Sequence, residues 1–135
     1  MIGLDTNALI RLLTQDDAGQ AAAVRKRLAP LDAVADAVLL NNMVLVETLW
    51  TLRRVYGFGK PDLAALLGQL LSATTFCFED RPAITRAAAL FAAGPADFSD
   101  CLIAVQNARL GCSTTVTFDK GMQGLPQVEL LSAKG

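Results

Sequence analysis

The chain opens with MIGLDTN (residues 1–7), a short apolar run that stops at a carboxylate. Ile2 and Leu4 are typical of a buried strand, and Asp, Thr and Asn are residues that cap the start of a helix. Asp5 is therefore expected where a strand passes into a helix over 8–14. In a parallel α/β sheet this junction lies at the carboxyl edge, where ligands bind beside a central strand. Capping of that helix is the alternative role for Asp5.

The composition favours a single domain over residues 1–135, because this length buries a core without disulfides or a structural metal. Polar residues interrupt every apolar run before the ~18 residues of a membrane span, and no signal peptide is evident, so we expect a cytoplasmic protein. Three cysteines lie far apart without a Cys-x-x-Cys pair. They are therefore expected to be free core thiols, not a disulfide framework or a zinc site.

The chain contains no histidine. This absence excludes Ser-His-Asp and Cys-His nucleophilic machinery and the usual His-rich zinc sites. Catalysis would have to rest on carboxylates, lysines or a hard metal ion. The formal net charge is −1, so there is no global basic footprint for nucleic acid, and such a substrate would be held locally.

Short apolar strands alternate with amphipathic helical patterns along the chain. Strands are expected over 2–4, 37–40, 75–78, 113–118 and 128–131, with helices over 8–14, 17–28, 43–56, 61–71 and 84–91 and a last one that begins near residue 99. This alternation predicts an α/β fold with a parallel sheet. The 61–71 helix carries an apolar seam of leucines at helical spacing, which packs on the core or on another subunit: Leu63, Leu66, Leu67, Leu70 and Leu71.

Four acids occupy positions that suit a binding site. Asp5 and Asp119 each follow a predicted strand, and Asp100 lies in the first turn of a predicted helix. Asp97 is the better candidate for capping that helix. Glu47 is expected on an otherwise apolar helix face, with a structural salt bridge to an arginine as the alternative. Carboxylates without histidine suggest a cage for Mg²⁺ or Mn²⁺, which prefer oxygen ligands and retain waters for chemistry.

Four segments together resemble a known family. These are residues 2–7, 44–47, 96–104 (ADFSDCLIA) and 117–120 (TFDK), in this order along the chain. They closely resemble the PIN-domain ribonucleases and, within them, the VapC-like toxins of bacterial toxin–antitoxin pairs. The resemblance implies a PIN-like three-layer fold in which helices flank a five-stranded parallel sheet of order 3-2-1-4-5. The strands that end in Asp5 and Asp119 would then be neighbours at the switch point.

The resemblance also implies an activity. One or two Mg²⁺ or Mn²⁺ ions held by Asp5, Glu47, Asp100 and Asp119 would activate water for attack on an RNA phosphodiester. Three residues would orient the metal ligands or the water without binding the metal themselves: Thr6, Asn7 and Ser99. The expected partners are RNA, a cognate antitoxin that covers the acidic pocket, and a second copy in a homodimer. The leucine seam and the helix before it are expected to contribute to such an interface.

Two positions depart from the family pattern. Gly121 stands where relatives carry a further acidic or amide residue, which bears on a second metal position. Asn41 and Asn42 stand where a small hydroxyl residue is usual, and asparagine caps a helix equally well. Three basic residues flank the turn before residue 61, either to contact RNA or as a solvated helix end: Arg53, Arg54 and Lys60.

Two non-catalytic alternatives remain open. One is a receiver-like signalling domain whose acids bind Mg²⁺, although Glu79-Asp80 matches poorly the phospho-accepting aspartate that such a domain needs after its third strand. The other is a PIN-like scaffold that binds RNA without cutting it.

Overall fold

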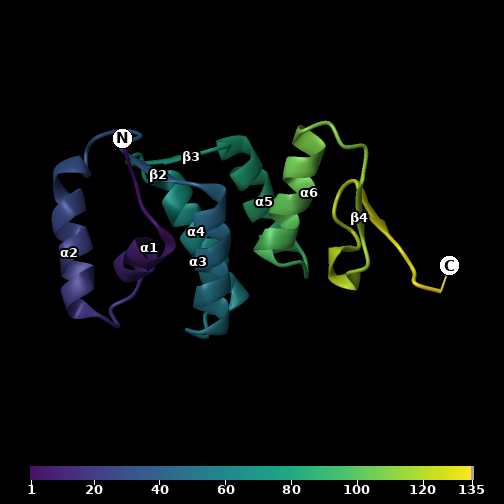
Figure 1. Cartoon of the computed structure of the whole chain (residues 1–135), viewed down its shortest axis with the longest axis horizontal. Coiled ribbons are helices and arrows are strands. Elements are labelled where there is room, and N and C mark those ends of the chain that lie inside the picture. Colours follow the sequence, from purple (N-terminus) through teal and green to yellow (C-terminus); the bar gives the residue numbers. More distant parts are fainter. Residues whose placement is uncertain (135) are drawn as a thin grey trace. The chain divides into compact units, whose positions relative to one another are not determined.

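The computed structural model describes residues 1–134 and divides into two compact units, Met1–Asp80 and the segment from Arg81 onward (Figure 1). Within the described residues, no helix is both long and apolar enough to cross a membrane.

The first unit has a three-stranded parallel sheet with β2 in the middle. Its elements are β1 (Ile2–Gly3), α1 (Thr6–Leu13), α2 (Ala18–Leu28), the 3-10 turn η1 (Ala29–Leu31), β2 (Val38–Leu40), α3 (Asn42–Arg54), α4 (Lys60–Ser72) and β3 (Phe76–Phe78). The register pairs Ile2 with Val38, and Val38 with Phe76. Asp5 lies between the end of β1 and the start of α1, so the predicted strand-to-helix junction is confirmed.

Buried aliphatic side chains from every layer form the core of this unit. Leu9 of α1, Leu40 of β2 and Leu45 of α3 are completely buried. The leucine seam of α4 contributes to the same core, since Leu63 and Leu67 are each only 1% exposed. The inner leucines of the seam therefore pack on the core, as one of the two expected alternatives had it. They have almost no exposed surface that a partner could contact.

The second unit pairs two helices with a two-stranded sheet. It comprises α5 (Arg81–Ala93), α6 (Phe98–Arg109), β4 (Thr115–Thr117), the 3-10 turn η2 (Lys120–Met122) and β5 (Val128–Leu130). The rings of Phe91 and Phe98 meet edge to face, 6.2 Å apart at 82°, where α5 joins α6. Strands β4 and β5 run parallel, with Thr115 opposite Val128.

The sheet differs from the expected continuous five strands. The described residues form one sheet of order β1-β2-β3 and a separate β4-β5 pair, so the 3-2-1 half and the 4-5 half are present without the link between β1 and β4. The backbone of β1 bonds to the β2 segment, through Ile2 N–H to Ala37 O (2.8 Å) and Leu4 N–H to Leu39 O (3.3 Å). Hydrophobic patterns predict strands, but they carry no information about which strands become neighbours.

The expectation of core thiols is correct for only one cysteine. Cys101 is buried in α6, Cys77 is half-buried and Cys112 is exposed. The number and spacing of the cysteines argue against a disulfide framework but do not determine whether each side chain is buried. The exposure of Cys112 could therefore not be predicted from the sequence.

A polar cluster ties the loop after α1 to the end of α3. Asp16 accepts hydrogen bonds from the hydroxyls of Tyr56 (2.6 Å) and Thr14 (2.8 Å), and its carboxylate lies 3.1 Å from Arg11 Nη1. The Tyr56 and Thr14 hydrogen bonds and the Arg11 charge hold the pKa of Asp16 below its usual value. Asp16 therefore stabilises the fold at neutral pH.

We expect Asp16→Asn to lower the melting temperature by a few degrees at pH 7. Because the folded-state pKa of Asp16 is depressed, its contribution is complete above its unfolded pKa of about 3.9 and is lost as pH falls through the folded value. The difference from the parent should therefore shrink below pH ~4. Thermal melts from pH 3 to pH 7 measure it, with Asp32→Asn, another exposed acid, as the control. A difference independent of pH would exclude this charge-based account.

Candidate functional site

In the first unit, the acidic residues gather where β1 and β2 pass into helices. Asp5 is the N-cap of α1, and its Oδ1 accepts the Ala8 N–H at 2.8 Å. The next residue, Thr6, donates its hydroxyl to Glu47 Oε1 of α3 at 2.9 Å. Thr6 therefore links the α1 start, where Asp5 sits, to the Glu47 carboxylate. Capping is a confirmed role of Asp5, and its exposed carboxylate keeps Oδ2 outside that capping bond.

Glu47 lies on an exposed face of α3 and not on the buried face that its apolar neighbours suggested. It is exposed, as are Met43 and Trp50 on the same side of α3. The buried face of the helix is instead formed by Val44, Leu45, Thr48, Leu49 and Leu52. Hydrophobic residue type does not guarantee burial. Because the polar residue Thr48 is part of the buried face, the spacing of hydrophobic residues alone did not identify that face. Glu47 consequently pays no burial penalty and needs no arginine partner.

Glu79 is a further acid at this edge that sequence reasoning did not assign. It follows β3, and its Oε1 accepts the Asn42 N–H at 2.8 Å in the first turn of α3. Asn41 provides the side-chain cap of the same helix, because its Oδ1 accepts the Val44 N–H at 2.9 Å. The two contacts fix the start of the helix that carries Glu47. The available signal was the position of Glu79 directly after a predicted strand.

In the second unit, two carboxylates lie close enough to Asp100 to affect its ionisation. Asp100 lies in the first turn of α6, and partial burial raises its pKa, with the negative charges of Asp119 and Asp97 raising it further. Asp97 occupies the N-cap position, but its side chain makes no capping hydrogen bond. The capping bond expected from the Asp97 side chain is therefore absent. Its spacing of three residues from Asp100 on one helical face was the signal that linked the two acids.

Asp119 is held by the turn that follows β4. Its Oδ1 accepts the Gly121 N–H at 2.8 Å, and its own N–H donates to Thr117 Oγ1 at 2.9 Å. A Cβ at position 121 would lie 3.1 Å from Asp119 Oδ1. The departure from the family pattern at Gly121 thus allows the backbone to approach and orient the Asp119 carboxylate.

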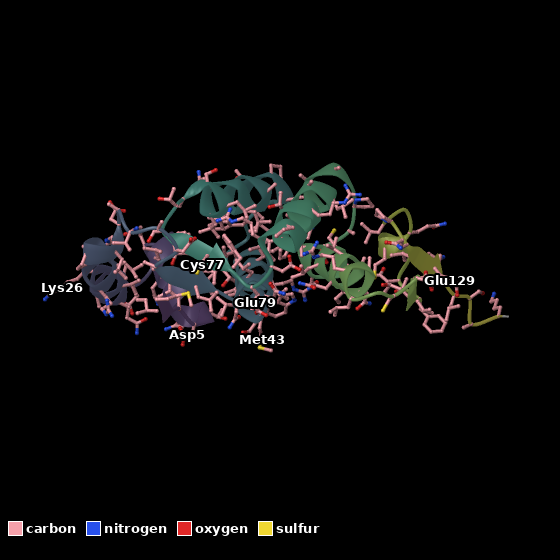
Figure 2. All side chains as sticks on the ribbon, turned by 90° about the horizontal axis from the view of Figure 1, so that it is seen from above. Asp5, Lys26, Met43, Cys77, Glu79 and Glu129 are labelled. Carbon is pink, nitrogen blue, oxygen red and sulfur yellow. The ribbon has the colours of Figure 1, made fainter. Side chains whose placement is uncertain are left out.

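The four predicted acids fall into two groups, one in each unit. Asp5 and Glu47 share the Thr6 link, while Asp100 and Asp119 share an electrostatic field with Asp97. Residues 1–134 contain no cluster of three or more potential ligands close enough to hold a metal. The donor chemistry nevertheless suits a hard cation, because carboxylate oxygens under mutual repulsion favour Mg²⁺ or Mn²⁺. Figure 2 shows Asp5 at the surface of its unit, next to solvent.

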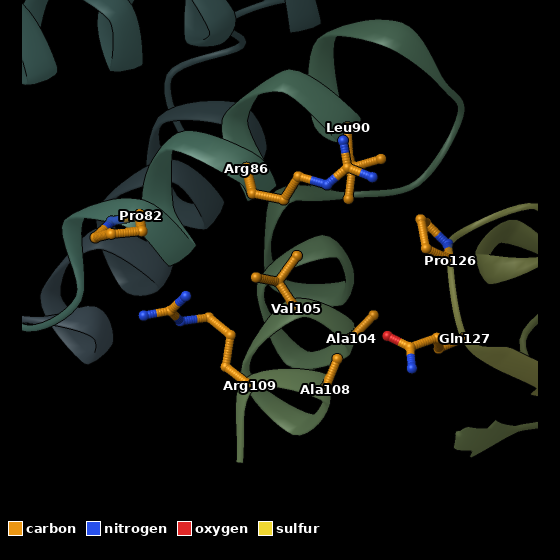
Figure 3. A pocket seen from close by; sticks show the side chains of 9 residues that line it. All are labelled: Pro82, Arg86, Leu90, Ala104, Val105, Ala108, Arg109, Pro126 and Gln127. Carbon is orange, nitrogen blue, oxygen red and sulfur yellow. The ribbon is translucent and has the colours of Figure 1, made fainter. Parts of the chain in front are cut away.

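A separate pocket of about 210 Å³ lies within the second unit, between α5, α6 and the turn before β5. Its floor is apolar, and Arg86 and Arg109 flank Val105 (Figure 3). Gln127 on the opposite wall has a φ of 57°, which is uncommon for a residue with a side chain. None of the four predicted acids lines this pocket, so it is distinct from the acidic groups.

Comparison with known proteins identifies one family. The family model described as PIN domain matches residues 2–127, a range that includes all four predicted acids and extends into both units. No curated protein gives a significant match.

Proposed function

Since the chain belongs to the PIN-domain family, whose members are generally nucleases, we propose that it is a metal-dependent endoribonuclease that acts as the toxin of a toxin–antitoxin pair. The observation that carries the proposal is Asp100, which is partly buried beside two further carboxylates. Such an arrangement costs free energy unless a cation compensates it, and it is typical of functional sites.

In this proposal, Asp5, Glu47, Asp100 and Asp119 hold one or two Mg²⁺ or Mn²⁺ ions. A bound ion of this kind lowers the pKa of its water and stabilises the leaving oxygen of a phosphodiester. The other residues orient these ligands. The Thr6 hydroxyl restrains Glu47, and the Gly121 N–H restrains Asp119, each leaving the second carboxylate oxygen outside that bond.

The proposal includes a single PIN domain over residues 1–135 with the strand order 3-2-1-4-5. One observation supports this order. Asp5 and Asp119 each lie two residues after the last residue of a strand, β1 and β4, as expected for central strands that end beside a ligand site at a switch point.

The proposed partners are RNA, a protein antitoxin that covers the acidic residues, and a second copy of the chain. RNA affinity would come chiefly from local phosphate contacts, because the net charge is only −1. Cytoplasmic action follows from this role, since both RNA and an antitoxin are encountered there. The inner leucines of the α4 seam do not serve these contacts because they lie in the core.

Titration of Mn²⁺ against a fluorescently labelled RNA tests the proposal and separates it from its alternatives. We expect internal cleavage that rises with Mn²⁺ or Mg²⁺ and returns to background after chelation, because the histidine-free chain offers no alternative activator. RNA binding without cleavage would favour the non-catalytic scaffold. Metal binding without RNA binding would favour the receiver-like signalling domain. Cleavage that survives thorough chelation would exclude the metal mechanism.

A further inference from the structure

Helix α3 presents an exposed stripe that begins near the acidic residues. Met43, Glu47, Trp50 and Arg54 recur at positions i, i+4, i+7 and i+11, and all four are exposed. Trp50 is 59% exposed and Met43 is 71% exposed. A single exposed apolar side chain is ordinary, but two large ones on one stripe with charged neighbours form a candidate binding surface.

Trp50 is paired with a cation on the same stripe. The guanidinium carbon of Arg54 lies 5.8 Å from the centre of the Trp50 ring, which is within the range of a cation–π contact. Arg54 is itself exposed, so its remaining N–H donors face solvent. The pair therefore offers a flat π surface together with a positive charge that is available to an anion.

The pair lies close to a proposed metal ligand. Trp50 follows Glu47 by three residues, about 4.5 Å along the helix axis. Thr6 connects Glu47 to the start of α1, where Asp5 lies. Figure 2 shows the Asp5 and Met43 side chains extending from the same side of the first unit. A nucleotide bound at Trp50 would thus lie within about one helical turn of Glu47.

We propose that Trp50 and Arg54 form a base-stacking subsite for single-stranded RNA. The Trp50 ring stacks on the unpaired base of a nucleotide, and Arg54 contacts a phosphate of the same strand. Aromatic rings bind unstacked bases of any sequence, whereas bases in a duplex are already paired and stacked. This inference rests on the proposed ribonuclease function. It adds a place outside the acidic residues where the RNA substrate contacts the protein.

The charges on the stripe favour RNA over a protein partner. The cores of protein–protein interfaces are depleted in charged residues, although tryptophan, methionine and arginine are common there. Here Glu47 separates Met43 from Trp50, and Arg54 follows, so the stripe alternates apolar and charged side chains. A surface of this kind matches a ligand with flat bases and a charged backbone.

The emission of Trp50 reports the contact directly, because it is the chain's single tryptophan. In metal-free buffer, a single-stranded oligoribonucleotide is expected to quench this emission saturably. An abasic oligomer of equal length and a duplex of the same sequence serve as controls, and both should quench much less. Equal quenching by the abasic oligomer would overturn the stacking subsite, because charge alone would then explain the binding.

Variants test the same contact through the anisotropy of labelled RNA in metal-free buffer. Trp50→Ala is expected to raise the Kd by about 5- to 150-fold, while Trp50→Phe retains most of the affinity. Arg54→Ala should weaken binding, and Arg54→Lys should restore it in part. Val55→Ala is the matched control, because Val55 lies at the same helix end and is 69% exposed. Its Kd should not change.

The outcomes separate this inference from the proposed function. If the parent cleaves RNA and Trp50→Ala binds it equally well, the subsite is wrong and the function stands. If emission shows base-dependent stacking but Mn²⁺ elicits no cleavage, the subsite stands and the nuclease function is wrong. Loss of self-association in Trp50→Ala, with unchanged RNA affinity, would make this stripe a subunit interface and overturn the subsite.

Discussion

Asp100→Asn is expected to abolish RNA cleavage and yet melt at a higher temperature than the parent in metal-free buffer. The substitution keeps the shape of the side chain but removes a proposed metal ligand. We expect kcat/KM to fall by about a thousandfold or more, equivalent to ~4 kcal/mol. The melting temperature should rise by a few degrees, because a partly buried charge beside Asp119 and Asp97 is removed.

The pH dependence of this stabilisation follows from the raised pKa of Asp100. A carboxyl group with a raised folded-state pKa destabilises the fold above that pKa and costs nothing below its unfolded value of about 3.9. The gap between Asp100→Asn and the parent should therefore be full at pH 7 and close toward pH 4. Glu129→Gln, which removes an exposed acid of the same unit, is the control. It should change neither the rate of RNA cleavage nor the melting temperature. A lower melting temperature for Asp100→Asn at pH 7 would contradict the account.

Two substitutions at Asp5 separate its capping role from its proposed role as a ligand. Asparagine caps a helix as well as aspartate, so Asp5→Asn should keep the bond to Ala8 N–H and the melting temperature. Alanine removes the cap, and Asp5→Ala should lose about 1 kcal/mol of stability. Both variants should lose cleavage by at least about a hundredfold, because each lacks the charged ligand. Melting curves and initial cleavage rates measure the two effects independently.

Full cleavage by Asp5→Asn would mean that Asp5 is only a cap. The polar cluster at Asp16 lies elsewhere in the same unit and supplies a control for stability without activity. Asp16→Asn should destabilise the fold while the cleavage rate at low temperature stays unchanged. A parallel loss of activity in that variant would indicate that the activity tracks general stability and not the acidic ligands.

Local features were predictable because they depend on a few adjacent residues. The apolar run before Asp5 and the capping residues after it locate β1 and α1, which begin and end within about two residues of the expected positions. Asn41 caps α3 as its residue type predicts. The alternation of short strands and amphipathic helices predicted parallel strands, and β1 with β2 and β4 with β5 do run parallel, but which strands are neighbours was implied only by the family resemblance.

Features that depend on distant partners were not predictable. The hydrophobic character of Met43 and Trp50 suggested a buried face for Glu47, but both side chains are exposed and the core lies against the other side of α3. Capping preference assigned Asp97 a structural role that its side chain does not perform. Which strands join into one sheet depends on contacts between segments far apart, and no local pattern encodes them.

Direct measurement of Mn²⁺ binding tests the central claim, that these carboxylates hold a divalent cation. Titration calorimetry should show saturable binding by the parent, which Asp5→Asn and Asp100→Asn each weaken at least about tenfold. Asp32→Asn and Glu129→Gln, one exposed acid in each unit, should bind Mn²⁺ like the parent. Equal Mn²⁺ affinity in the parent and all four variants would contradict the account, because the acids would then have no part in holding the metal.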